Sequence, residues 1–207
     1  MGIEARPKQA IITAMERTSV SLLDRLRQQA APEDWTRLID LYKPFIERFI
    51  RFDSALAADA EDICQEVLKK LVEHLPKFRR ERDGSFRTWL KTITLNEVNA
   101  FWRHRLRRRG VYGDGGSLLL SGLQDPRNEL SQLWDREHGG HVLRSLQEQI
   151  EPDFAPVTWQ AFRLRVYEEK STDEVAASLG ISKNAVDIAK SRVLARLRKE
   201  AAGLIEE

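Results

Sequence analysis

Residues 172–189 read TDEVAASLGISKNAVDIA, and their apolar positions fall where two crossed helices would touch. Ala176 lies where the two helices approach most closely, so a larger side chain would push them apart. Gly180 lies in the turn, where a positive φ costs glycine least. Ser182 is a good N-cap for the second helix. This stretch predicts a helix-turn-helix, whose apolar contact positions are Val175, Leu179, Ile181, Val186 and Ala189.

The second helix of this motif is rich in cations and is expected to run to about Lys199. Such a helix fits the major groove of duplex DNA, with its N-terminal residues at base edges and its flanking cations on phosphates. A helical hairpin in an ordinary bundle would need the same apolar contacts but not a basic second helix, so we expect DNA binding. The cations are Lys183, Lys190, Arg192, Arg196 and Arg198.

Three further helices are predicted upstream of the motif. The clearest spans 60–75, where apolar residues recur at offsets 0, 3, 4, 7, 8, 11, 12 and 15, and Pro76 marks its end. A second is expected over 35–50, with Pro44 kinking or splitting it. A third covers 86–101 and runs into an arginine-rich stretch. No stretch alternates with the period of two that a half-buried strand requires, so the expected fold class is all-α.

A glycine-rich connector separates two helical blocks. Residues 110–140 hold seven of the chain's 11 glycines and are typical of a flexible segment, with a short helix near 129–137. We therefore expect two small helical domains joined by a flexible linker. The parts are an N-terminal extension over 1–19, expected to be partly disordered, a first domain over 20–110, an acidic linker over 111–140 and a second domain with the helix-turn-helix over 141–207.

Charge is segregated along the chain, although its formal net value is only +2. Residues 77–109 hold 11 basic and 3 acidic residues, a net +8. Residues 111–153 hold 3 basic and 8 acidic residues, a net −5, and residues 163–199 hold 9 basic and 5 acidic ones, a net +4. This pattern indicates two modules that each meet a polyanion, joined by a segment that does not. A set of solvated helix faces is the alternative explanation.

Composition narrows the class of protein. A length of 207 residues fits one or two small domains, and 42% hydrophobic residues fit a globular fold. The one cysteine, Cys64, excludes an internal disulfide framework and a multi-cysteine zinc site. No apolar run is long enough for a transmembrane helix, and residues 1–19 lack the apolar core of a signal peptide. We expect a cytoplasmic protein with no membrane insertion, no metal and no cofactor.

Aromatic and basic residues interleave over 78–109. Cations hold phosphates, and aromatic rings offer stacking surfaces for unpaired bases. Asn96 and Asn99 add side-chain amides that could read base edges. This stretch therefore predicts a second contact with nucleic acid, on single-stranded segments.

Together these features resemble a known family. The chain is similar to bacterial RNA polymerase sigma factors of the extracytoplasmic-function group, the two-domain type made of region 2 and region 4. The resemblance covers about residues 20–110 and 141–200. Its motifs are DAEDICQEV at 59–67, which resembles region 2.2, GSFRTWLKTITLN at 84–96, which resembles regions 2.3 and 2.4, and LGISKNAV at 179–186, which resembles region 4.2.

The resemblance implies a transcription initiation factor rather than an enzyme. Its partners would be core RNA polymerase, the −35 element as duplex and the −10 element as a melted single strand, and the family allows an anti-sigma factor as a further partner. The residues implied in core-polymerase binding are Asp59, Glu61, Asp62, Ile63, Gln65 and Glu66. Those implied at the −10 element are Arg79, Arg80, Ser85, Arg87, Lys91, Asn96, Asn99, Arg103, Arg107 and Arg108. Those implied at the −35 element are Thr172, Ser182, Lys183, Asn184, Asp187, Ile188, Lys190, Ser191, Arg192 and Arg196.

One stretch departs from the family pattern. Many members carry a basic triplet directly after the valine of the recognition helix, whereas here Val186 is followed by Asp187, Ile188 and Ala189. A Lys-Ser-Arg triplet begins only at Lys190, about one turn later. An acid in the groove repels phosphates but accepts a hydrogen bond from cytosine N4. The resemblance therefore leaves the preferred −35 sequence open.

Two other classes of protein compete with this interpretation. An enzyme could use Asp62 and Glu66, which share a helix face, as metal ligands. However, acids at a helix start are explained by the dipole, and the chain lacks a phosphate-binding loop and a nucleophile motif. An ordinary helix-turn-helix regulator would bind duplex promoter DNA by itself, whereas a sigma factor would need core polymerase.

Overall fold

The computed structural model describes residues 21–28, 31–79, 85–108 and 129–205 of the 207-residue chain. Over these ranges the chain is helical and forms no β-strand, which confirms the all-α prediction, and no helix is both long and apolar enough to cross a membrane. The expected extension over 1–19 lies outside them. The helices are α2 (Leu22–Gln28), α3 (Pro32–Arg51), α4 (Ala60–His74), α5 (Ser85–Arg108), α7 (Glu129–Ile150), α8 (Pro156–Val166), α9 (Thr172–Leu179) and α10 (Lys183–Ala201).

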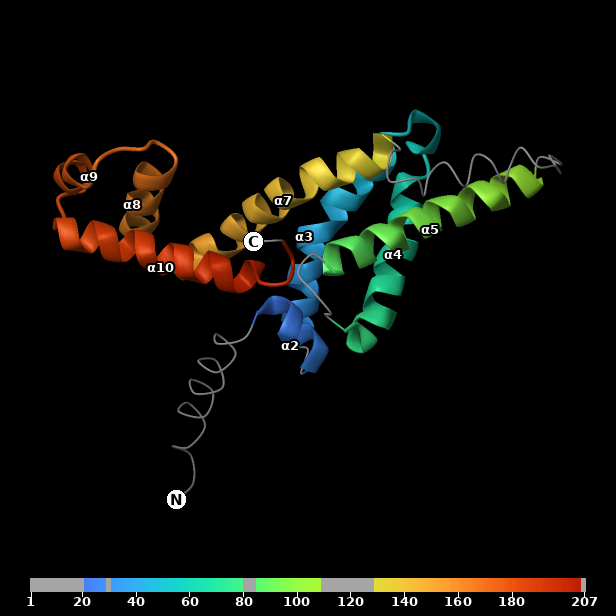
Figure 1. Cartoon of the computed structure of the whole chain (residues 1–207), viewed down its shortest axis with the longest axis horizontal. Coiled ribbons are helices and arrows are strands. Elements are labelled where there is room, and N and C mark those ends of the chain that lie inside the picture. Colours follow the sequence, from blue (N-terminus) through green and yellow to red (C-terminus); the bar gives the residue numbers. More distant parts are fainter. Residues whose placement is uncertain (1–20, 29–30, 80–84, 109–128, 206–207) are drawn as a thin grey trace, which may run out of the picture.

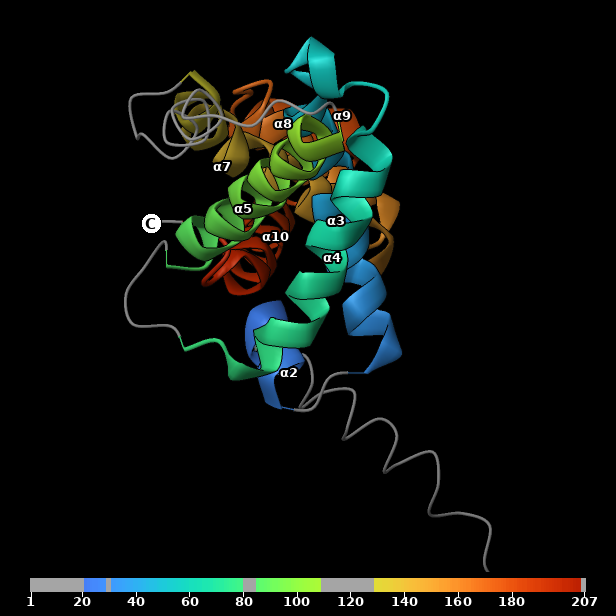
Figure 2. The same ribbon diagram turned by 90° about the vertical axis from the view of Figure 1, so that its right-hand side faces the viewer.

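Helices α3, α4 and α5 form the core of a first module, which Figure 2 shows along the long axis of the molecule. The helix expected over 60–75 is α4, and a 3₁₀ turn over Leu75–Lys77 follows it at Pro76. The apolar positions of α4 point inward, and Cys64, Val67 and Leu71 are completely buried. Each such side chain contributes about 1.5–3 kcal/mol when it is removed from water. The apolar spacing therefore locates both this helix and its buried face.

Helix α3 continues without a break through Pro44, contrary to the expected kink or split. Proline removes one backbone N–H from the helix and crowds the preceding turn. Here Pro44 and Asp40, whose carbonyl loses its partner, both lie on the exposed side of α3. Water can bond that carbonyl, while the opposite face of the helix stays packed in the core. Tertiary packing thus outweighs the local tendency to break the helix.

Helix α7 corrects the predicted connector. A flexible linker over 111–140 is wrong for residues 129–140, which form the first half of α7, while 111–128 lie outside the described ranges. Trp134 of α7 is completely buried, and its ring centroid lies 4.7 Å from that of Phe45 and 4.9 Å from that of Phe49 in α3. A domain boundary at residue 140 would cut this packed helix in its middle. The first module therefore includes α7.

The acidic charge assigned to the linker is partly neutralised by this packing. Asp135 of α7 pairs with Lys91 of α5 over 2.8 Å, and Glu137 pairs with Arg48 of α3 over 3.6 Å. These two acids therefore hold α7 on the first module instead of forming part of a free acidic segment.

Two histidines lie in the interface between α3 and α7. His138 is completely buried, its Nε2 lies 3.3 Å from the hydroxyl oxygen of Tyr42, and its Nδ1 has no hydrogen-bond partner among the residues that the structure describes. The Nε2 of His141 lies 2.7 Å from the carbonyl oxygen of Leu41. Burial, reinforced by the nearby Arg87 guanidinium, lowers the pKa of His138 to about 3. The folded protein therefore keeps this imidazole neutral at pH 7.

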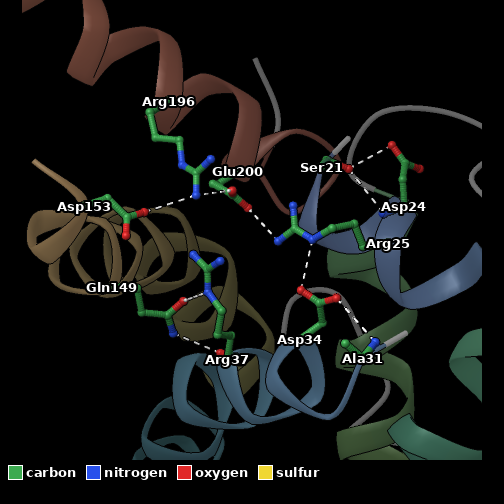
Figure 3. A network of polar contacts seen from close by, with 10 residues as sticks. All are labelled: Ser21, Asp24, Arg25, Ala31, Asp34, Arg37, Gln149, Asp153, Arg196 and Glu200. Atoms are coloured by element: carbon green, nitrogen blue, oxygen red, sulfur yellow. Dashed lines mark hydrogen bonds and ion pairs between the residues drawn. The ribbon is translucent and has the colours of Figure 1, made fainter. Parts of the chain in front are cut away.

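The C-terminal half of α10 packs against α7 and α2, so the two modules share one interface. At its centre, Arg25 of α2 donates hydrogen bonds to Asp34 of α3 over 2.9 Å and to Glu200 of α10 over 3.2 Å (Figure 3). All three side chains are buried, and Glu200 is completely so. A buried charge is costly unless it keeps its partners. This network therefore fixes the end of α10 on α2 and α3.

Further polar contacts surround the Arg25 network (Figure 3). Arg196 pairs with Glu200 and with Asp153 over 3.2 Å each, and so joins α10 to the 3₁₀ turn over Glu151–Asp153. The amide of Gln149 in α7 donates to the carbonyl oxygen of Arg37 in α3 over 2.9 Å. The docked arrangement is thus held by further polar contacts beside the buried arginine (Figure 3).

The interface lies between two ends of an elongated molecule. Helix α9 and the start of α10 lie at one end of the long axis, and the C-terminal end of α5 lies at the other (Figure 1). The last part of the first basic block and the helix-turn-helix of the second are therefore presented at opposite ends.

Replacing Arg25 by methionine should lower the free energy of unfolding by about 3–5 kcal/mol, because the buried carboxylates of Asp34 and Glu200 would lose the guanidinium that lies between them. Arg27→Met is the matched control on the same helix. Arg27 pairs with Asp24 at a partly exposed site, so its loss should cost less than about 1 kcal/mol. Urea unfolding followed by circular dichroism measures both variants. Equally small losses would contradict the role given to Arg25.

His138→Gln should flatten the dependence of stability on pH. The unfolded chain binds a proton on this imidazole below a pH of about 6.5, whereas the folded protein does so only near pH 3. Stability from this group is therefore lost as the pH falls, by about 1.4 kcal/mol per pH unit between pH 6 and 4. Unfolding curves at several pH values should show a shallower slope for the variant. The control, His74→Gln on the exposed side of α4, should keep the wild-type slope, and identical slopes for all three proteins would contradict the assignment.

Candidate nucleic-acid interface

Helices α9 and α10 form the predicted helix-turn-helix, and local caps set its ends. The hydroxyl of Ser171 accepts a hydrogen bond from the backbone N–H of Glu174, and the Glu174 carboxylate accepts one from the N–H of Ser171. The Ser171 hydroxyl also donates to the Glu174 carboxylate over 2.7 Å, and this bond, together with the one from the Ser171 N–H, holds the pKa of Glu174 below its usual value. Gly180 ends α9 at a φ of 66°, and Ser182 caps α10 by accepting from the N–H of Ala185 over 3.1 Å. The turn and the second N-cap are as predicted.

A small apolar core holds the two helices in their crossed geometry. Val175, Val186 and Ala189 are buried as predicted, and Ala161 and Leu164 of α8 complete the cluster. The other contact positions of the motif are partly buried at its edge. This core fixes which side of α10 faces α8 and α9, and therefore which side faces solvent.

Most of the residues predicted at the −35 element lie on that exposed side. Thr172 and Lys190 are half-buried and border it. The exposed ones are Ser182, Lys183, Asn184, Asp187, Ile188, Ser191 and Arg192.

Two polar contacts join the start of α10 to the start of α9. The Nζ of Lys183 lies 2.7 Å from the Asp173 carboxylate, and the hydroxyl of Thr172 donates to the Asp187 carboxylate over 3.4 Å. Both contacts place their α10 residue on the side of the helix that faces α9. Asp187, the residue that departs from the family pattern, therefore has a partner within the helix-turn-helix.

The prediction that Arg196 contacts the −35 element is wrong. Its guanidinium pairs with Asp153 and with the buried Glu200, and most of its side chain is shielded from solvent. The helical rotation turns position 196 away from the exposed side of α10 and toward the interface between the modules. Its charge holds that interface and is not displayed for DNA.

Helix α4 presents an acidic and polar face to solvent. Glu61, Asp62, Gln65 and Glu66 are exposed, and their spacing puts them on one side of the helix. Ile63, predicted with them, is 3% exposed and packs in the core, which is a correction. Its side chain belongs to the buried stripe of α4 and is not available to a partner.

Arg105, which sequence reasoning missed, ties the basic end of α5 to the start of α4. Its guanidinium donates to the carbonyl oxygen of Ala55 over 2.9 Å and to the carboxylate of Asp59 over 3.4 Å. It also lies 5.5 Å from the ring centre of Trp102, a cation–π distance. The spacing of Trp102 and Arg105, three residues apart on one helix, is the signal that could have found it. Asp59, predicted to contact polymerase, is engaged in this contact and half-buried.

The last turns of α5 present several separate cations. They can contact successive phosphates because each one points into solvent. Arg80 and the side chain of Ser85 lie outside the described residues. The exposed members of the predicted −10 set are Arg79, Asn96, Arg103, Arg107 and Arg108.

Three other members of that set are held by the fold, which corrects their prediction. Asn99 is 4% exposed, so its amide does not reach the surface where a base could bind. Lys91 pairs with Asp135 of α7 over 2.8 Å. Arg87 is half-buried beside His138. Each of them faces α7, or the core beneath it, and that packing is not visible in the local sequence pattern of α5.

The geometry supports binding to charged macromolecules. An acidic face attracts a cationic partner, and cationic surfaces attract phosphates. Across the described ranges, no three His, Cys, Asp or Glu side chains gather closely enough to hold a metal ion. The surfaces therefore fit two kinds of macromolecule, one basic and one polyanionic.

Comparison with known proteins agrees with this division. The family model of Sigma-70 region 2 matches residues 38–108 and that of Sigma-70, region 4 matches residues 156–197, so the two cover more than half of the chain. The chain is also 26% identical over 142 residues to the RNA polymerase sigma-E factor of Streptomyces coelicolor, which is 69% of this chain and 71% of that protein. The segment between the matched ranges contains α7.

Gly180→Ala should lower the free energy of unfolding by about 1 kcal/mol, because a φ of 66° strains any residue with a Cβ. Space is not the obstacle, since no atom of the described ranges, apart from the adjoining residues, lies within 4 Å of the added Cβ. Gly140→Ala, exposed within α7, should instead raise stability by up to about 1 kcal/mol, because alanine favours the helix and its Cβ meets only the Arg144 side chain at 3.7 Å. Urea unfolding of both variants tests the contrast, and changes of the same sign would contradict it.

Proposed function

The chain belongs to the sigma-70 family as a promoter-recognising transcription initiation factor of the two-domain, extracytoplasmic-function type, and we propose that three of its surfaces divide this task. The exposed face of α4 binds core RNA polymerase, the basic end of α5 engages the −10 element, and α10 reads the −35 element as duplex. One observation carries the proposal. An exposed acidic face and a basic helix-turn-helix lie in separate modules of one chain, each within a matched range.

The polymerase contact is assigned to α4 because the residues on its outer face are exposed and do not pack in the core. Glu61, Asp62, Gln65 and Glu66 are exposed, while the opposite side of the helix is packed in the core. From the family resemblance, the partner of this face is the clamp coiled coil of the β′ subunit. Carboxylates on one side of a rigid helix suit a basic partner and would steer its approach.

The −10 contact is assigned to the end of α5 because exposed arginines line its last turns. Arg103, Arg107 and Arg108 supply charge for the phosphates of a melted strand. Arg105 holds this end of α5 on the residues just before α4. The polymerase-binding face and the −10 surface therefore keep one relative geometry, so docking of α4 also places α5.

The −35 contact is assigned to α10 because its capped N-terminal half is exposed. The backbone there is fixed by the Ser182 cap and by the apolar core of the motif. Arg192 and Lys190 lie where they can reach phosphates beside a base-reading face. An anti-sigma factor stays a prediction from the resemblance.

Run-off transcription tests the proposal. Purified full-length chain, mixed with core RNA polymerase, should direct initiation at specific promoters in a genomic fragment library, and neither component should do so alone. Specific binding to duplex DNA without core polymerase, together with no initiation in its presence, would instead identify a helix-turn-helix regulator.

Charge reversal tests the surface on α4. Asp62→Lys combined with Glu66→Lys should weaken core binding at least about tenfold, because two cations would face the basic partner. Both side chains are exposed, so the circular dichroism spectrum and urea midpoint should stay close to wild type. The matched control reverses two exposed acids elsewhere, Asp40→Lys with Glu148→Lys, and should retain core affinity. Equal affinities for both double variants, measured by fluorescence anisotropy, would reject α4 as the binding surface.

A further inference from the structure

An uncharged stripe runs along the exposed side of α10. It consists of Asn184, Ile188, Ser191 and Ala195, whose spacing of i, i+4, i+7 and i+11 puts them on one face. All four are exposed, while the opposite face of the helix is buried. Ala195 is not among the residues predicted from the family resemblance, so the stripe is a feature of the folded helix.

Charged residues border this stripe on both sides. At about 100° of rotation per residue, Lys183, Asp187 and Arg198 fall along one edge, and Arg192 and Lys199 fall along the other. The first edge is of mixed charge, since Asp187 is an acid and Lys183 pairs with Asp173. In a major groove, base edges form the floor and phosphates line both rims. A neutral central stripe with cations at both edges fits that arrangement when the stripe faces the bases.

Ile188 is the apolar member of the stripe, and the fold makes little use of it. Its side chain is 41% exposed and lies outside the apolar cluster that holds the helix-turn-helix together. A single exposed isoleucine is ordinary on a protein surface. Its position is what suggests a contact with DNA. Ile188 lies on the neutral stripe one turn after Asn184, in the N-terminal half of α10.

We propose that Ile188 reads the C5-methyl group of a thymine in the −35 element. Thymine is the one base that presents an apolar group in the major groove, so it is the natural contact of an aliphatic side chain there. Asn184, about 6 Å away along the helix, faces a position one or two base pairs distant, where its amide suits adenine. The inference deepens the proposed function of α10 and rests on it.

The inference also accounts for the departure from the family pattern. Asp187 lies at the edge of the exposed side and accepts a hydrogen bond from Thr172. The next residue therefore occupies the stripe, and the basic triplet that begins at Lys190 lies one turn further on. Sequence discrimination at this step comes from an apolar contact rather than from a cation on guanine.

In the first step of the test, holoenzyme is assembled from core polymerase and the full-length chain. It is then used to select the duplexes that it binds from a pool with a randomised −35 element. Each thymine of the selected element is then replaced by deoxyuridine, which removes only the C5-methyl group. At one position this change should weaken binding about three- to fivefold, the effect of one buried methyl group. Ile188→Ala should weaken binding to the thymine duplex and be insensitive to deoxyuridine at that same position, as a double-mutant cycle requires.

Val157→Ala is the matched control. Val157 is also 41% exposed, but it lies on α8, so this variant should keep the wild-type response to deoxyuridine. A selected element without A·T pairs, or deoxyuridine losses that are equal in wild type and Ile188→Ala, would overturn the inference. So would a loss of core affinity in Ile188→Ala without DNA, which would assign Ile188 to polymerase. Failure of the proposed function is distinguishable, because holoenzyme would then select no −35 sequence at all.

Discussion

A guanidinium buried among carboxylates from two other helices is the contact on which the arrangement of this protein depends. Arg25 bonds Asp34 of α3 and Glu200 of α10, and these side chains are shielded from water. Removing one member of a buried ion network costs several kcal/mol, because the charges that remain buried lose part of their compensation. Apolar packing supplies most of the stability of each module, but it is non-directional. The ion network is what selects one seating of α10 on α2 and α3.

That seating gives α10 two separate roles along its length. Its N-terminal half is held by the small core of the helix-turn-helix and turns an uncharged stripe to solvent. Its C-terminal half is held by the first module through Glu200 and Arg196. Because a helix is a rigid rod, the orientation of this exposed stripe follows from contacts made several turns away. The ends of α10 and α5 for which we propose DNA contacts consequently lie at opposite ends of the molecule (Figure 1).

Helix α7 makes this arrangement possible by completing the first module. Trp134 fills the space against Phe45 and Phe49, and the neutral His138 lies beside Tyr42 in the same interface. Its surface acids pair with Lys91 of α5 and Arg48 of α3. Three exposed arginines, Arg103, Arg107 and Arg108, lie within the last six residues of α5.

Local spacing was enough to predict the helix-turn-helix, the buried stripe of α4 and the all-α fold, because caps, turns and apolar periodicity act over a few residues. The local spacing also indicated helix α7, although the glycines of this stretch obscured the pattern. Its apolar residues recur at multiples of four, at Leu130, Trp134, Val142, Leu146 and Ile150. The roles of Lys91, Arg196 and Arg25 were decided by the tertiary structure alone. Each of the three has one carboxylate partner far away in the chain, at 44, 43 and 175 residues respectively, and no local pattern specifies which distant carboxylate a cation will meet. Whether a charged side chain faces DNA or another helix is therefore settled only when the helices pack.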